Sequence, residues 1–323
     1  MAVTLTQLTS FLAVVRHGSV TAAAEELVVT QPSVSAAVAA LERELGIKLT
    51  ERVGRNVRPT PAGEAYAQYA ADVLGLLKQG SEVAGEVARG AGSRLRMAAV
   101  TTAGEYLLPP LIRSFREQHP ELEVSLHVGN REGVFRRLES HEVDVAISGR
   151  APEGRGFEAV PFTDNEFVLI TAPGDPLVER PWVDPSDLAN IPWLMREQGS
   201  GTRRLCEVYL DSHGLRPALL TLGSNGAIKN AARMGLGVAL QSRIAVELEL
   251  GFGLLATIHP RGGLPKRSWY VVSSTVGPRS HAVEAFSRYA RSSAARRALA
   301  EARGDEIEQT QTAFTREAPS PRR

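Results

Sequence analysis

Apolar residues near the start of this chain recur at steps of three and four, the period of amphipathic helices. The first stripe predicts a helix and consists of Leu5, Leu8, Phe11, Leu12 and Val15. A second helix is expected from an N-cap at Ser19 to about Leu27. A third is expected from an N-cap at Thr30, with Pro32 in its first turn. Together they predict a three-helix unit with a small core of its own.

The third predicted helix has an apolar stripe and an uncharged opposite face. The stripe consists of Val34, Val38, Leu41 and Leu45, and the opposite face of Gln31, Ser33, Ser35, Ala36, Ala39 and Ala40. Amide and hydroxyl groups can hydrogen-bond to base edges and methyl groups can contact thymine, so this face fits the DNA major groove. Phosphate contacts must come from elsewhere, and Arg52, Arg55 and Arg58 lie in a Gly-containing hairpin pattern that predicts a basic wing. The alternative is a generic helical hairpin with a solvated charged loop.

This segment, from Leu5 to Gly63, resembles the winged helix-turn-helix of LysR-type transcriptional regulators. The matching residues are Leu8, Phe11, Ser19, Ala23, Ala24, Leu27, Gln31, Pro32, Ser33, Ser35, Leu41, Glu42, Leu45, Gly46, Leu49, Arg52, Thr60, Ala62 and Gly63. The chain departs from the family pattern at Thr50, where Phe is usual, and at Ala36, where a basic or amide residue is common. The resemblance implies double-stranded DNA as a partner. The expected contact residues are Thr21, Gln31, Pro32, Ser33, Ser35, Arg52, Arg55 and Arg58.

A long helix is predicted next, from an N-cap at Thr60 and a Pro61 in its first turn to about residue 89. Its apolar and small residues at alternating steps of three and four form a coiled-coil seam of Tyr66, Tyr69, Val73, Leu76, Gly80, Val83 and Val87. Paired through this seam, a dimer would present two recognition helices to a pseudo-palindrome with half-sites about one helical turn apart. The resemblance likewise implies dimers through this helix, and commonly tetramers. The alternative is an amphipathic helix docked on its own domain.

Beyond a run of small residues at 89–93, the pattern changes to alternating strands and helices. The first set predicts strands at 95–100, 122–128 and 143–147 and helices at 105–118 and 131–140. The second predicts strands at 167–171, 193–195, 219–222 and 238–240 and helices at 202–212 and 227–234. A strand at 269–274 and a helix at 280–300 then return to the first set. Repeated βα units predict mostly parallel sheets with helices on both faces.

Two chain crossings between these sets predict two lobes, a hinge and a ligand cleft. The effector domains of LysR-type regulators, which resemble periplasmic binding proteins, have this layout. The predicted fold is therefore α/β, with a winged helix-turn-helix at 1–60 and a dimerising linker helix at 61–89. Lobe I would span 90–164 and 268–300, and lobe II 165–267. The charged segment 301–323 is expected to be a disordered tail.

Four loops at the carboxyl ends of predicted strands are candidates for effector binding, because helix N-termini there point N–H groups outward. In the last of them, REQGSGTRR, glycine lets the backbone approach a ligand and Arg203 can form two parallel bonds to a carboxylate or phosphate. Alternatively, Ser200 and Thr202 only cap their helix while the arginines are solvated. The expected effector-binding residues are Thr101, Thr102, Asn130, Arg131, Gly149, Ser200, Gly201, Thr202, Arg203 and Asn225, with Arg150 also facing the cleft.

A narrower resemblance lies in the stretches HVGNREGVFRRL, EVDVAISGRAP, REQGSGTR, SNGAIKNAARMGLGVALQS and AVELELGFG. They are similar to the CbbR branch, regulators of carbon-fixation operons whose effectors are phosphorylated metabolites or nicotinamide nucleotides. This resemblance implies a small anionic effector and RNA polymerase as a partner. Because the run from Thr101 to Gly104 departs from the branch, a carboxylate or aromatic effector stays open.

Composition supplies no overall basic field, since 37 Lys and Arg face 36 Asp and Glu in 323 residues, a net charge of +1. DNA affinity would depend on local arginines and on pairing two binding units. No apolar run approaches a membrane span and no signal-peptide layout begins the chain, so a cytoplasmic protein is expected. The lone Cys206 is expected to be a small buried hydrophobe and no redox sensor.

An enzyme and a solute-binding protein are the rival classes for a two-lobed α/β cleft. Against an enzyme, the sequence has no Gly-rich phosphate loop with Lys, no His pair at metal spacing and no nucleophile elbow. We therefore expect no catalytic residues, metal or cofactor. A solute-binding protein would not need residues 1–60, so deleting them would separate these classes.

Overall fold

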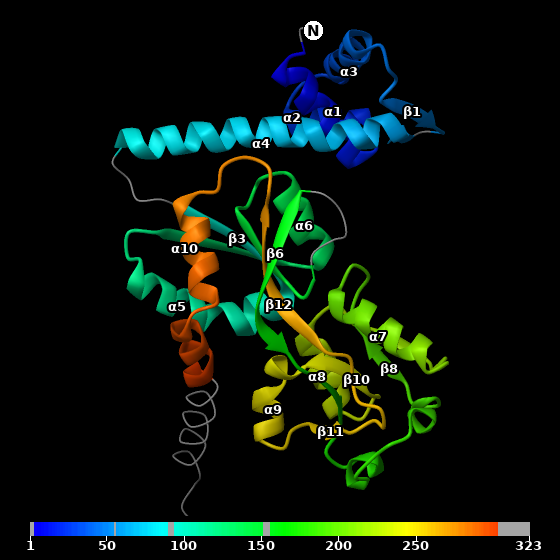
Figure 1. The fold of residues 1–323 in the computed structure, drawn as a ribbon. Helices are drawn as coiled ribbons and strands as arrows, with labels where there is room; N and C mark the ends of the chain where they lie inside the picture. The colour runs from blue at the N-terminus through cyan, green and yellow to red at the C-terminus, as the bar shows by residue number, and fades with distance from the viewer. Residues whose placement is uncertain (1–2, 55, 90–93, 151–155, 303–323) are drawn as a thin grey trace, which may run out of the picture. The chain divides into compact units, whose positions relative to one another are not determined.

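The computed structural model describes residues 3–54, 56–89, 94–150 and 156–302. The first part of the chain contains α1 (Leu5–His17), α2 (Val20–Leu27), α3 (Gln31–Leu45), the hairpin β1 (Thr50–Val53) and β2 (Asn56–Pro59), and the long α4 (Pro61–Arg89) (Figure 1). These elements form a winged helix-turn-helix followed by one continuous helix. The three predicted N-terminal helices and the wing are confirmed.

The caps that the sequence predicts are formed. The Ser19 hydroxyl accepts from the Ala22 N–H at 3.3 Å, and the Thr30 hydroxyl accepts from the Ser33 N–H at 3.4 Å. Glycine residues with φ of 63° and 66° end α1 and α3. The core of this unit consists of Leu8, Phe11, Ala13, Val14, Ala23, Ala24, Val34, Val38, Leu41, Leu49 and Ala70.

Glu42 joins α3 to the wing through its buried carboxylate. Its Oε1 accepts from the backbone N–H groups of Leu49 and Thr50 and from the Thr50 hydroxyl, each at 3.0 Å. Burial alone would raise the pKa of Glu42, but the Lys48 ammonium and these donors hold it below its usual value. The departure from the family pattern at Thr50 thus supplies a third donor to Glu42.

Lobe I contains a five-stranded sheet in the order β4-β3-β5-β12-β6. Its strands are β3 (Arg94–Val100), β4 (Glu123–Gly129), β5 (Val145–Ser148), β6 (Phe157–Asn165) and β12 (Arg267–Ser274). β3 runs parallel to β4 and β5, whereas β12 runs antiparallel to β5 and β6. The expected mostly parallel sheet is therefore only half right for lobe I, because β6 was not predicted and β12 enters from the opposite end after lobe II. Pro161 obscures β6 in the sequence and is tolerated because β6 is an edge strand.

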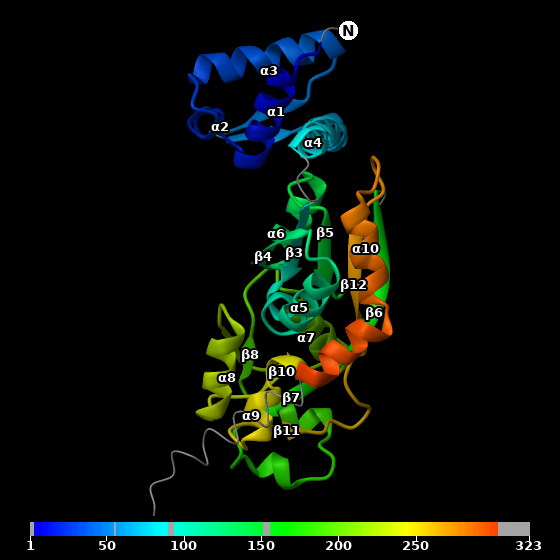
Figure 2. The ribbon, with the colours of Figure 1, turned by 90° about the vertical axis from the view of Figure 1, so that its left-hand side faces the viewer.

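The helices of lobe I are the short π-helical η1 (Ala103–Leu107), α5 (Leu108–Gln118), α6 (Arg131–Glu139) and α10 (His281–Ala290), followed by a helical stretch at 293–302. The single helix predicted at 280–300 is thus two helices, interrupted at Arg291 and Ser292. α5 and α10 share one apolar core with β3 and β12, and Figure 2 shows α6 on the side of the sheet away from α10.

Lobe II is built around β10 (Ala239–Ser242), β7 (Phe167–Thr171) and β11 (Ala256–Ile258), in that order, with β7 antiparallel to both neighbours. The parallel pair β8 (Trp193–Met195) and β9 (Leu219–Thr221) continues beside β10 through a bridge between Trp193 and Val238. Its helices are α7 (Gly201–Ser212), α8 (Asn225–Arg233), α9 (Glu247–Gly251) and the one-turn η2 (Pro176–Glu179), η3 (Pro185–Leu188) and η4 (Arg243–Ala245). β11 and α9 were not predicted, and the antiparallel pairing of β7 corrects the expected parallel sheet.

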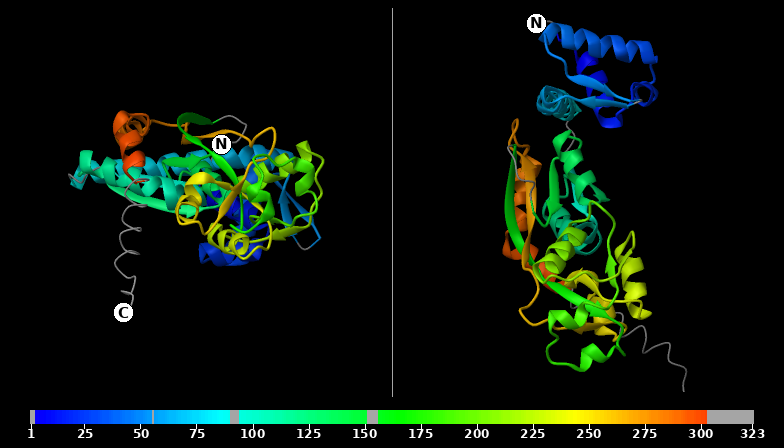
Figure 3. Two further views of the ribbon diagram at one scale, coloured as in Figure 1. Left: turned by 90° about the horizontal axis from the view of Figure 1, so that it is seen from below. Right: turned by 90° about the vertical axis from the view of Figure 1, so that its right-hand side faces the viewer.

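Successive residues of the lobe II strands enter two separate cores, one on each face of the sheet. Leu169 and Leu240 belong to one core, and Ile170 and Ala239 belong to the other. The chain passes between the lobes through the segments after β6 and before β12, and Figures 1 and 3 show these two strands running from one lobe toward the other. No described helix is both long and apolar enough to cross a membrane.

Candidate functional sites

The first turn of α3 presents the uncharged face that the sequence predicts. Gln31, Pro32 and Ser33 are exposed and Ser35 is half-buried. The Gln31 amide lies 3.4 Å from the Ser35 hydroxyl, and the Thr30 and Ser33 hydroxyls lie 2.8 Å apart. Thr21 on α2 is also exposed. These groups can exchange their mutual hydrogen bonds for bonds to base edges.

The wing places its two described arginines on opposite faces. Both Arg52 and Arg58 are exposed, but Arg52 is paired with Val57 and Arg58 with Glu51. Because neighbouring strand residues alternate between faces, Arg52 and Arg58 extend to opposite sides of the wing. Arg55, the third predicted wing arginine, lies outside the described residues.

On α4, the predicted seam divides into a part that packs on its own chain and a part that is exposed. Tyr66 is half-buried and packs on its own chain, because its ring lies 6.0 Å from that of Phe11 against the helix-turn-helix core. Tyr69 is 71% exposed, and Val73 and Val83 are also exposed. Leu77 is exposed as well and was not predicted. Of the other predicted members, Gly80 is exposed and Leu76 is half-buried. The side chain of Val87 lies outside the described part.

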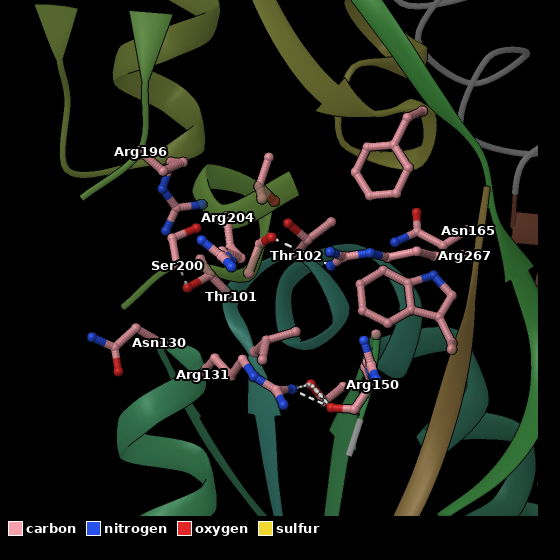
Figure 4. Close-up of a pocket in the computed structure, with 17 residues that line it drawn as sticks. Thr101, Thr102, Asn130, Arg131, Arg150, Asn165, Arg196, Ser200, Arg204 and Arg267 are labelled. Atoms are coloured by element: carbon pink, nitrogen blue, oxygen red, sulfur yellow. Dashed lines mark hydrogen bonds between the residues drawn. The ribbon is translucent and has the colours of Figure 1, made fainter. Parts of the chain in front are cut away.

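A cavity of about 350 Å³ lies between the two lobes (Figure 4). Eight of the ten predicted effector-binding residues line it: Thr101, Thr102, Asn130, Arg131, Gly149, Ser200, Gly201 and Thr202. Val100, Ser148, Arg150, Asn165, Phe167, Arg196, Arg204, Arg267 and Trp269 complete the lining. The lining thus combines hydroxyls, amides and five guanidinium groups with two aromatic rings.

Arg203 does not line the cavity, which corrects the sequence prediction. Its Nε donates to Glu207 at 2.8 Å, and its Nη1 donates to the Arg196 carbonyl at 2.9 Å and the Thr221 hydroxyl at 3.2 Å. Its neighbour Arg204 lines the cavity instead. Successive residues on a helix point about 100° apart, so a sequence pattern cannot decide between two adjacent arginines.

Ser200 combines the two roles that the sequence analysis set against each other. It caps α7 by accepting from the Arg203 N–H at 3.5 Å, and it also lines the cavity. Asn225, the other predicted residue outside the lining, is 1% exposed and accepts from Arg196 Nη1 at 2.6 Å.

Three guanidinium groups in the lining, those of Arg131, Arg204 and Arg267, have no carboxylate partner within the described parts of the chain. Arg131 donates to the Ser148 hydroxyl at 3.0 Å and to the Arg150 carbonyl, and Arg267 donates to the Gly201 carbonyl at 3.3 Å. Burial lowers the pKa of Arg267, and repulsion from Arg131 and Arg150 lowers it further. Burial also lowers the pKa of Arg131, with a second contribution from Arg150. An anion in the cavity would relieve this repulsion.

Arg196 was missed by the sequence analysis although it directly follows β8. It is 4% exposed, and Glu197 neutralises its charge through two bonds of 2.7 and 2.9 Å. The rule applied to the other loops, that ligands bind at carboxyl ends of strands, would have identified it. Among the described residues, no group of three or more His, Cys, Asp or Glu could hold a metal ion.

Two family models match the chain. One, described as "Bacterial regulatory helix-turn-helix protein, lysR family", matches residues 5–64, and the other, "LysR substrate binding domain", matches residues 88–295. The chain belongs to the LysR family of transcriptional regulators.

Two curated relatives come from the carbon-fixation group. This LysR-family chain is 37% identical over 298 residues to the RuBisCO operon transcriptional regulator of Allochromatium vinosum, covering 92% of this chain and 98% of the relative. It is 35% identical over 270 residues to the HTH-type transcriptional activator CmpR of Synechocystis, covering 83% and 88%. These relatives are regulators of transcription, and the chain is a ligand-responsive regulator, not an enzyme.

The effector part also resembles a solved structure, the Synechocystis PCC6803 CcmR regulatory domain in complex with 2-PG. The TM-score is 0.59 at 32% identity, over 62% of this chain and 96% of that domain. The predicted two-lobed fold and the resemblance to carbon-fixation regulators are therefore confirmed.

Cys206 of this LysR-family chain is buried in the lobe II core. Burial, with a smaller contribution from Glu207, raises the pKa of its thiol to about 12. The thiolate, the form that attacks a peroxide, is therefore almost unpopulated near neutral pH.

Proposed function

We propose that a small anionic metabolite binds in the cavity between the lobes and thereby controls how this regulator acts at its operator. The observation that carries the proposal is the set of three buried or cavity-facing guanidinium groups without carboxylate partners around a 350 Å³ space. The hydroxyls of Thr102 and Thr202 line the same space and can donate to ligand oxygens, whereas the Thr101 hydroxyl, also in the lining, donates to the Gly129 carbonyl at 3.2 Å. The 2-PG bound by CcmR, an anion of this size class, supports the same assignment.

The aromatic part of the lining limits the shape of this anion. Phe167 and Trp269 are almost fully buried and both line the cavity. They offer apolar contact beside the arginines of the lining, which can meet charge. A compact anion with a short carbon skeleton fits this arrangement, and a carboxylate or aromatic anion is a competing occupant that the experiment below separates.

On DNA, the proposed reader is α3 with Thr21 and the wing. Gln31, Pro32, Ser33 and Ser35 would read base edges, and Arg52, Arg55 and Arg58 would contact phosphates. We propose that the exposed apolar row of α4 pairs two chains, so that a homodimer or tetramer binds a pseudo-palindromic operator in the cytoplasm and contacts RNA polymerase. The row supports pairing because Tyr69, Val73 and Leu77 follow one another at four-residue steps.

A thermal-shift panel on the full-length protein tests the effector assignment. The panel contains 2-PG, inorganic phosphate, sugar phosphates, nicotinamide nucleotides, dicarboxylates and aromatic carboxylates. An effector present at 100 times its Kd should stabilise the protein by about 2.7 kcal/mol. Arg204→Gln should abolish the shift, whereas Arg216→Gln, an exposed arginine of lobe II outside the cavity, should keep it. If no anion shifts the wild type, or if Arg204→Gln responds as the wild type does, the assignment is wrong.

A further inference from the structure

Beyond the effector cavity itself, we propose that Asn225 is a positioning residue that fixes the arrangement of the two lobes by joining Arg196 of lobe II to Thr102 and Glu105 of lobe I. This inference rests on the proposed function only where it concerns ligand affinity. The lobe arrangement is a property of the ligand-free protein and is testable alone.

The side chain of Asn225 lies between a cation and a carboxylate. Its Oδ1 accepts from Arg196 Nη1 at 2.6 Å, while its Nδ2 lies 3.4 Å from the Thr102 hydroxyl and 3.3 Å from Glu105 Oε2. A guanidinium only donates and a carboxylate only accepts, so the amide orientation is fixed by chemistry. A neutral amide, with one acceptor and one donor group, suits both neighbours at once.

The lobe I side of this contact is the short π-helical segment η1, which packs against β4 on its other side. Thr102, Glu105 and Tyr106 lie three and four residues apart, the spacing that puts side chains on one face of a helical turn. Gly104 faces the other way, where an added Cβ would lie 2.5 Å from the Val128 side chain. η1 is therefore fitted between β4 and the N-terminal turn of α8, and π-helical turns of this kind are frequent at functional sites.

A second contact one turn further along α8 supports the same arrangement. Lys229 Nζ lies 3.3 Å from the Tyr106 hydroxyl and 5.3 Å from the centre of its ring, and Glu249 pairs with it at 2.7 Å. Asn225 and Lys229, four residues apart, thus meet Thr102, Glu105 and Tyr106 as one surface against another. Of these five residues, Thr102 lines the cavity and the other four do not.

The hydrogen bonds of Asn225 determine which N–H and O–H groups of Arg196 and Thr102 can donate to a ligand in the cavity. Arg196 has five N–H groups, and Glu197, Asn225 and Thr101 occupy four of them. One N–H of Arg196 is left for a ligand. Because Asn225 donates to the Thr102 oxygen, the Thr102 hydroxyl hydrogen is free to point into the cavity. Asn225 therefore sets both groups as donors toward an anion.

The test is a pair of substitutions that changes the hydrogen bonds and then restores the charge. Asn225→Asp keeps an oxygen toward Arg196 but places a carboxylate against Glu105. Adding Glu105→Gln returns the net charge to that of the wild type and supplies an amide donor to the new carboxylate. Asn230→Asp, the same chemical change at an exposed position of α8, is the matched control.

The first readout is the distance between lobes in the ligand-free, full-length protein. Spin labels at Ser125→Cys and Ala218→Cys, two exposed positions, report this distance by pulsed dipolar spectroscopy. Labelled chains are diluted in unlabelled protein, and the native Cys206 is buried and so is protected from labelling. We expect Asn225→Asp to broaden or shift the distance distribution, and Glu105→Gln to restore it in the double variant. An unchanged distribution in Asn225→Asp, or no restoration in the double variant, overturns the proposal.

The second readout is affinity for 2-PG and for inorganic phosphate by calorimetry. Asn225→Asp should weaken binding at least tenfold. The double variant should recover the lobe distance but only part of the affinity, because the Thr102 hydroxyl would donate to the new carboxylate instead of the ligand. Full recovery of affinity in the double variant would overturn the role of Asn225 in orienting Thr102. If the wild type binds neither anion, 2-PG and inorganic phosphate are excluded as effectors, and the lobe distances still decide whether Asn225 sets the lobe arrangement.

Discussion

Replacing Glu42 by Ala should detach the wing from the recognition helix. Glu42 is 7% exposed and Leu49 is 2% exposed, so the substitution leaves the Leu49 N–H buried without an acceptor. An unsatisfied buried N–H costs about 1–3 kcal/mol, and the half-buried Thr50 N–H and hydroxyl add a smaller amount. The Lys48 partner is 80% exposed, so the ion pair itself contributes about 0–1 kcal/mol. The total is a loss of about 3 kcal/mol from the winged helix-turn-helix.

Hydrogen exchange followed by mass spectrometry measures this loss in the full-length protein. Peptides covering 46–54 should exchange roughly a hundredfold faster in Glu42→Ala, since each 1.4 kcal/mol corresponds to about a factor of ten. Peptides of lobe II should exchange as in the wild type. Glu51→Ala, an exposed carboxylate on the same wing, is the control and should change exchange by little. Equal protection of 46–54 in Glu42→Ala and the wild type would refute the assignment of Glu42 as the anchor of the wing.

The same carboxylate predicts a pH dependence of this unit. The pKa of Glu42 in the folded protein lies below its usual value of 4.5. Its contribution is therefore complete above pH 4.5 and is lost as the pH falls through the lower, folded-state pKa. Glu42→Gln should flatten this acid-side loss of protection at 46–54.

Three further predictions concern the cavity, the linker helix and the thiol. Arg203→Gln should lower the melting temperature of the effector part, measured by calorimetry, more than Arg204→Gln does, because Arg203 makes three contacts within lobe II. Arg204→Gln should instead abolish the ligand response and leave operator affinity, measured by gel shift, intact. Val73→Lys should yield monomers in sedimentation and remove the gel shift, while Gln68→Lys at an exposed polar position of α4 should do neither; an unchanged sedimentation coefficient in Val73→Lys would contradict pairing through α4. Cys206 should resist thiol reagents at pH 8 until denaturant is added, because its pKa is about 12; rapid labelling of the native protein would contradict its burial.

Sequence reasoning succeeded where structure is determined by neighbouring residues. The caps at Ser19 and Thr30 and the stripes of α1 and α3 are local, so their spacing predicted the helices and their ends. β6 failed because its pairing partner β12 lies about a hundred residues later and Pro161 hides the strand pattern. Antiparallel pairing in lobe II failed for the same reason, since strand direction depends on which distant strand lies alongside.

For the cavity, the sequence predicted which loops contribute residues, but not which side chains of each loop point into the cavity. Eight predicted residues line the space because each follows a strand at the edge where ligands bind. Arg203 and Asn225 come from the right loops yet point to Glu207 and Arg196, and their roles depend on contacts with other elements. Arg267 and Trp269 belong to the returning strand β12, and their distance along the chain from the other loops concealed them.

The distribution of charge explains how a chain of net charge +1 can bind two anionic partners. The proposed DNA-reading face of α3 is uncharged and the proposed phosphate contacts come from the wing, so one helix-turn-helix unit would make few phosphate contacts and bind weakly. The proposed pairing through α4 would double those contacts and would make operator affinity depend on the spacing of the two units. The cavity, in contrast, concentrates arginines, three of them without a carboxylate partner in the described parts of the chain, between lobes that Asn225 and Lys229 join at one edge. A ligand acts only through its different affinity for two lobe arrangements. This difference in ligand affinity is a few kcal/mol at most. It can switch a pair of DNA-binding units that each bind weakly and whose spacing can change.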